Sequence, residues 1–147
     1  MWAVLVVLAV LALARAPAER AAMYERQRVG LSVELPQGWT IVRKPLTACT
    51  DPAQRIATRR GRALVQIVEQ LAHDVSGFPD RPRRFELPGR AEWLACCPPA
   101  EGKGWFIPFR DGGRGFYAYV YADGRETRAE ALEILDSLRV RPRAAAP

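Results

Sequence analysis

Histidine and cysteine are scarce in this 147-residue chain, which has one histidine and three cysteines. The cysteines are Cys49, Cys96 and Cys97, so no two of them form the Cys-x-x-Cys pair typical of zinc sites. A structural zinc ion needs four ligands in a tetrahedral arrangement, and the adjacent Cys96 and Cys97 do not easily bind one ion together. We therefore expect no metal site and no cofactor.

The state of the cysteines depends on the compartment, and two interpretations are open. In an oxidising compartment, one disulfide would join Cys49 to Cys96 or Cys97 and leave one free thiol. In a reducing compartment, all three would be small buried apolar residues.

The chain also lacks the common catalytic signatures. None of its serines lies in a Gly-x-Ser-x-Gly motif. The glycine-rich segment Asp111–Gly115 lacks the Gly-Lys-Ser/Thr ending of a phosphate-binding loop and predicts a hairpin turn. His73 and Asp74 could act as a base and its orienting carboxylate, but no nucleophile has a recognisable context. We expect no catalytic residues; the alternative is an enzyme of unrecognised class that uses His73 and Asp74.

Lysine is nearly absent, whereas arginine is abundant. Lys44 and Lys103 are the only lysines among 22 basic residues, and 16 acidic residues leave a net charge of +6. Arginines cluster at residues 55–62 and 81–84, which makes an anion-binding module a further alternative. The candidate anion-binding residues are Arg59, Arg60, Arg62, Arg83 and Arg84.

Nucleic acid is not an expected partner, because no recognised nucleic-acid-binding fold accompanies the basic residues. Tyr117, Tyr119 and Tyr121 line one face of a predicted strand, as a stacking platform would. We favour the other interpretation, in which this face is covered by another layer and the tyrosine hydroxyls lie at its rim.

Long apolar runs are also missing, apart from one at the start of the chain. Residues 2–14 carry no charged or polar side chain. As a helix they would span about 20 Å, less than the roughly 30 Å of a bilayer core. Small-x-small sequences follow at residues 12–14 and 16–18, as signal peptidase requires. Residues 1–18 are thus predicted to be a signal peptide or membrane anchor, with membrane contact through residues 2–14.

This segment predicts a secreted or membrane-attached protein outside the cytoplasm. No basic residue precedes the apolar run, whereas several arginines follow it, which is the reverse of the usual charge distribution. The alternative is therefore a cytoplasmic chain whose translation starts at Met23.

The rest of the chain divides into a linker at residues 19–28, one domain at residues 29–143 and a tail at residues 144–147. Residues 29–35 alternate apolar and polar side chains. A turn at Pro36–Gly38 follows and residues 39–42 resume the strand, which predicts a hairpin. Further strands are expected at the ranges 55–59, 63–71, 104–109 and 115–122.

A surface loop is expected from Asp74 to Gly89, with a brief strand near Phe85 and Leu87. Pro108 restricts the strand at 104–109 to a sheet edge or to a bulge.

The helix prediction is the most detailed. Thr127 and Glu130 match a capping box at the start of a helix that runs to Leu138. An apolar stripe follows through this helix and consists of Ala131, Leu132, Ile134, Leu135 and Leu138. Together these elements predict an α+β fold, in which an antiparallel sheet of about six strands has a C-terminal helix packed on one face. An N-terminal apolar helix precedes this domain.

Three segments carry a resemblance to known proteins: GLSVELPQGWTIV (30–42), LTACTDPAQRIAT (46–58) and FIPFRDGGRGFYAYVYADGRETRAEALEILDSLRV (106–140). They resemble small exported or membrane-attached domains of unknown function from high-GC bacteria. The first segment and the terminal helix are also similar to the PsbP-like sandwich, an antiparallel sheet flanked by helices. The resemblance implies no assigned reaction. We therefore expect a non-enzymatic accessory or interaction domain whose partner is a protein or an anionic surface.

Overall fold

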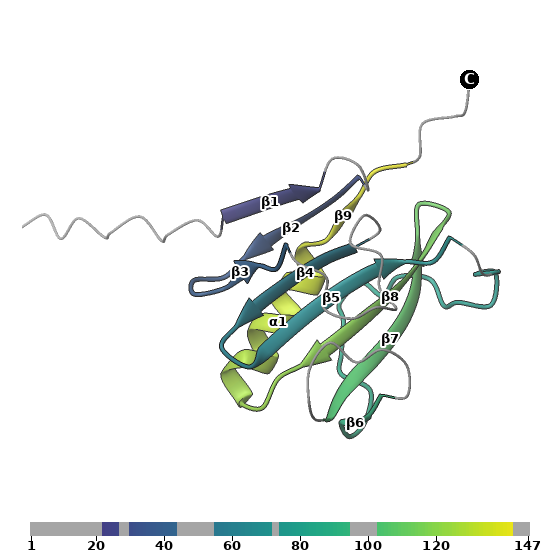
Figure 1. Ribbon diagram of the computed structural model, residues 1–147. Coiled ribbons are helices and arrows are strands. Elements are labelled where there is room, and N and C mark those ends of the chain that lie inside the picture. The colour runs from purple at the N-terminus through teal and green to yellow at the C-terminus, as the bar shows by residue number, and fades with distance from the viewer. Residues whose placement is uncertain (1–21, 27–29, 44–54, 72–73, 95–102, 143–147) are drawn as a thin grey trace, which may run out of the picture.

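The computed structural model describes residues 22–26, 30–43, 55–71, 74–94 and 103–142 (Figure 1). These residues form a six-stranded antiparallel sheet, a smaller sheet and one C-terminal helix, which confirms the α+β class. Several predicted features lie outside the described residues. They are the apolar segment 1–18, the three cysteines, His73 and the tail 144–147.

The main sheet has the strand order β3-β4-β5-β8-β7-β6, and every neighbouring pair is antiparallel. The four long strands agree with the predicted ranges to within a few residues at their ends. The bounds are β3 Thr40–Ile41, β4 Arg55–Arg60, β5 Ala63–Glu69, β6 Glu92–Trp93, β7 Lys103–Asp111 and β8 Arg114–Tyr121.

The smaller sheet has the order β1-β2-β9, formed by Ala22–Arg26, Leu31–Leu35 and Arg139–Val140. Two expectations are corrected here. Residues 22–26, expected to belong to the linker, pair with β2, and the predicted hairpin is wrong because β2 and β3 belong to different sheets. The turn itself forms, since the Trp39 N–H donates to the Pro36 carbonyl at 3.1 Å. After this turn the Trp39 side chain is buried, and the next two residues pair with the edge of β4.

Helix α1 (Arg125–Ser137) begins two residues before Thr127, so the predicted capping box is wrong. Gly124 is the N-cap, and its N–H donates to the Thr127 hydroxyl at 3.1 Å. Glu130 is drawn away from the cap, because it accepts hydrogen bonds from the Trp39 indole and from Arg60. Burial raises the pKa of Glu130, but these two donors outweigh burial and hold it below its ordinary value.

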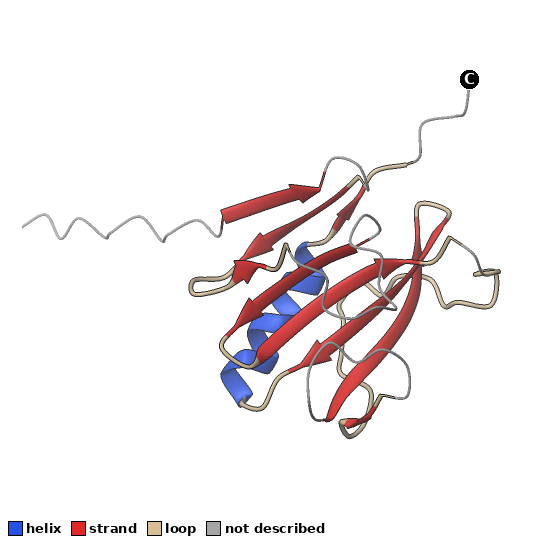
Figure 2. Cartoon of the chain, in the orientation of Figure 1, coloured by secondary structure: helices blue, strands red, loops and turns tan. Residues whose placement is uncertain are grey.

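The helix covers one face of the main sheet, as Figure 2 shows, and packs most closely against β2 and β5. Its buried residues are Ala131, Ile134 and Leu135, with Leu138 just beyond its end. They share one apolar core with Phe116, Ala118 and Val120 of β8. Leu132 departs from the predicted stripe, because it is only half-buried at the margin of this core.

Residues of the loop between β5 and β6 bind the C-terminal end of α1. The Arg81 guanidinium donates to the carbonyls of Leu138 and Asp136 at 2.7 and 3.0 Å and pairs with Asp111 at 2.8 Å. A cation at a helix C-terminus also compensates the helix dipole. No strand forms near Phe85 and Leu87, in contrast to the prediction, because the Phe85 N–H donates to the Asp136 side chain instead of a neighbouring strand.

Candidate interaction site

Four aromatic rings lie together on the sheet face opposite α1. Tyr117 and Tyr119 alternate along β8 with the core residues, so they project away from the helix. Phe106 of the adjacent strand β7 lies beside both, with ring centroids 4.5 and 5.3 Å away. Phe78 approaches Tyr117 at 4.9 Å. We call these four residues the aromatic face.

The start of the long loop brings Phe78 into place. Val75 packs directly on Gly115, where any side chain would overlap with it, and the Phe78 N–H donates to the Val75 carbonyl at 3.0 Å. Asp74 fixes the first turn, since it accepts hydrogen bonds from the backbone N–H and the hydroxyl of Ser76, both at 2.9 Å. These bonds lower the pKa of Asp74. Asp74, the candidate catalytic carboxylate, therefore stabilises the first turn of this loop.

The aromatic face is accessible in part. Phe106 is 37% exposed, and the other three rings are half-buried. Tyr121, the third tyrosine of β8, is only 4% exposed, and burial raises its pKa to about 12, with a smaller contribution from Tyr119. Neither sequence interpretation describes this face fully, because Tyr121 is covered whereas Tyr117 and Tyr119 still reach the surface.

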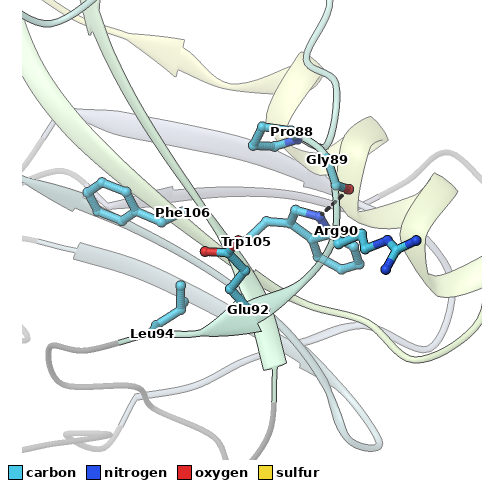
Figure 3. A pocket seen from close by; sticks show the side chains of 8 residues that line it. Pro88, Gly89, Arg90, Glu92, Leu94, Trp105 and Phe106 are labelled. Carbon is cyan, nitrogen blue, oxygen red and sulfur yellow. Dashed lines mark hydrogen bonds between the residues drawn. The ribbon is translucent and has the colours of Figure 1, made fainter.

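A pocket of about 340 Å³ opens beside Phe106, where β6 meets β7. We call it the edge pocket. Trp105 forms part of its lining, and the indole N–H donates to the Gly89 carbonyl at 3.2 Å. Figure 3 shows the Glu92 carboxylate within the ring of lining side chains, whereas the Arg90 guanidinium points away. The lining residues are Pro88, Gly89, Arg90, Glu92, Leu94, Gly104, Trp105 and Phe106.

The backbone edge of β7 offers little room for an added strand. At one end β6 pairs with Lys103 and Gly104, and at the other end Arg110 exchanges backbone hydrogen bonds with Pro79 and Arg81, both at 2.8 Å. Pro108, between them, has no N–H to donate. Pro108 therefore leaves the open part of this edge without a donor, and a partner at this site would contact mainly side chains.

The candidate anion-binding arginines lie in two separate places. Arg60 is paired with Glu126 and Glu130 near the start of α1, and these carboxylates raise its pKa. Arg59 and Arg62 are exposed at the β4–β5 hairpin on that side. Arg83 and Arg84 are exposed in the loop that binds the opposite end of α1. The two sequence clusters are thus at opposite ends of the helix and form no single basic surface.

The sequence did not indicate the edge pocket or the place of Phe78. The signal for Phe106 was present, because it shares the outward-facing positions of β7 that lie opposite the tyrosines of β8. The pocket depends on the long loop before β6, whose course no local pattern fixes. Among the described residues, no group of three or more His, Cys, Asp or Glu is placed to hold a metal ion.

No protein-family model matches this sequence, and no curated protein and no solved structure is significantly similar to the chain. The resemblance to exported domains and to the PsbP-like sandwich therefore stays a prediction. Within the part of the chain that the structure describes, no helix is both long and apolar enough to cross a membrane.

Proposed function

We propose that this protein is a non-enzymatic interaction domain, exported or membrane-attached, which binds a protein partner through the aromatic face and the edge pocket. The observation that carries the proposal is the position of Phe106. Its partly exposed ring belongs both to the aromatic face and to the pocket lining, so the two form one continuous surface.

The composition of this surface supports a protein partner. Aromatic residues are enriched in protein–protein interfaces, and Tyr and Trp are frequent among the few residues that dominate the binding energy. The exposed parts of an antiparallel sheet usually carry polar side chains, whereas on this face Phe106 is 37% exposed beside Tyr117 and Tyr119. The apolar segment at residues 2–14 supports the export part of the proposal.

The anion-binding alternative has less support, because the arginine clusters lie at opposite ends of α1 and Arg60 is already engaged by two carboxylates. An enzymatic role for His73 and Asp74 also has less support, since the Asp74 carboxylate is held by Ser76.

One experiment tests both parts of the proposal. The chain carries a C-terminal tag and is expressed in its native host, where cytoplasmic and extracytoplasmic fractions are sized by gel filtration. We expect it in the extracytoplasmic fraction, in a complex larger than its own 16.4 kDa. Phe106→Ser should release the free chain, because a polar residue replaces the ring shared by both halves of the surface.

Leu71→Ser is the matched control, because Leu71 is 49% exposed beyond the end of β5 and outside this surface. It should leave the complex intact. A wholly cytoplasmic chain would reject the export part. A monomeric wild-type chain, or equal behaviour of both variants, would reject the interaction surface.

A further inference from the structure

We infer that the edge pocket binds one basic side chain, a lysine or arginine, from a partner that is otherwise neutral or acidic. This inference rests on the proposed function and names the group that the site recognises. It follows from three observations: an available carboxylate, apolar lining residues that can pack against the stem of a basic side chain, and the net charge of the chain.

The carboxylate is that of Glu92. Its side chain is exposed, and among the described residues no hydrogen bond or ion pair engages it. Figure 3 places it inside the ring of lining side chains, between Phe106 and Trp105. A carboxylate can accept a bidentate guanidinium or an ammonium through charge-assisted hydrogen bonds.

The walls suit the rest of a basic side chain. Lysine and arginine have apolar stems, which can pack against Pro88, Leu94 and the Phe106 ring. A cation over an aromatic ring gains further electrostatic attraction. The same fold already shows this contact, since the Arg128 guanidinium lies 5.3 Å from the Trp105 ring centroid.

The neighbouring cations do not neutralise Glu92 in the structure. Arg90 lines the pocket, but its guanidinium points away from the carboxylate. Lys103 lies across from Trp93 in the strand pairing, and Glu92 lies across from Gly104, which has no side chain. Among the described residues, no cation is therefore paired with the Glu92 carboxylate, which remains available to a cation from a partner.

The net charge of +6 limits the kind of partner. A polybasic segment would be repelled as it approached the chain, whereas a neutral or acidic partner would not. A single lysine or arginine in such a partner can pair with the Glu92 carboxylate, while the rest of the partner is not repelled by the positive net charge of the chain.

The test is an NMR titration of the full-length chain that follows the indole N–H of Trp105. The probes are the blocked amino acids Nα-acetyl-arginine amide and Nα-acetyl-lysine amide, with Nα-acetyl-norleucine amide as the uncharged analogue. We expect saturable shifts with the two basic probes and weaker binding of norleucine. Glu92→Gln should weaken the basic probes about tenfold, the loss expected for a charge-assisted hydrogen bond.

Glu133→Gln is the matched control, because Glu133 is exposed on α1 outside the pocket, and it should leave binding unchanged. Equal binding of norleucine, or an unaffected Glu92→Gln, would reject recognition of the charge. Absence of shifts with every probe would reject the site. These outcomes are separable from the proposed function, because the complex could still depend on Phe106 when the pocket binds no basic probe.

Discussion

Leu135→Ala is expected to lower the free energy of unfolding by about 2–5 kcal/mol, a large part of the roughly 5–15 kcal/mol typical of a domain. Leu135 is fully buried in the core that α1 shares with β8. The substitution removes apolar contacts and leaves a cavity between helix and sheet. A 13-residue helix is marginal alone, so its stability depends on this packing.

Urea unfolding of two further variants provides the comparison. Leu132→Ala makes the same chemical change one turn away at a half-buried position, and it should cost clearly less than Leu135→Ala. Thr127→Ala removes the hydroxyl that binds the Gly124 backbone and should cost about 0.5–2 kcal/mol. If Leu135→Ala unfolded no more easily than Leu132→Ala, the described docking of α1 would be wrong.

Arg114→Met is expected to destabilise the domain by about 3–5 kcal/mol, because it removes the guanidinium that donates to both oxygens of the buried Glu69 carboxylate. The two side chains are only 6% and 5% exposed, and Arg114 donates to both carboxylate oxygens at 2.8 and 2.6 Å. Arg114 also donates to the Arg141 carbonyl at 2.8 Å, next to strand β9. Arg114 thus connects the main sheet to the segment just after β9.

The double variant Glu69→Leu, Arg114→Met should recover most of this loss, because neither buried charge remains. Arg110→Met is the surface control: Arg110 pairs with Asp80, which is 86% exposed, so its loss should cost about 1 kcal/mol or less. Chemical denaturation of all three measures the differences. Equal stability of Arg114→Met and Arg110→Met would contradict the buried pair.

The strands were predictable because their information is local. Alternating side chains along β8 and the apolar run of β5 follow directly from the two-residue period of a strand. Which strands pair with one another was harder to predict. Residues 31–35 and 40–41 join different sheets, and Trp39 between them donates to Glu130 of α1, about 90 residues further along the chain.

Side-chain partners distant in sequence explain the other differences. Thr127 and Glu130 fit a capping box in isolation, but Trp39 and Arg60 compete for Glu130 in the folded chain. Arg60 and Arg81 read as members of basic clusters, whereas each binds one end of the helix. Charge counted along a sequence does not show which cations the fold has already paired.

The candidate site was predictable only where a local pattern determines it. The outward position of Tyr117 and Tyr119 follows from alternation along one strand. Phe106 completes the surface through the register between β7 and β8, and Phe78 through the course of the long loop. The predicted hairpin turn between β7 and β8 sets that register, whereas no local pattern encodes the course of the long loop.

The central claim is that the surface containing Phe106 contacts a partner, and site-specific photo-crosslinking in the native host tests it most directly. p-Benzoylphenylalanine replaces Phe106 in one variant and Ala129, which is exposed on α1 over the other sheet face, in the second. Irradiation should give a discrete adduct at position 106 that is absent at position 129. No adduct at 106, or the same adducts at both positions, would contradict the account.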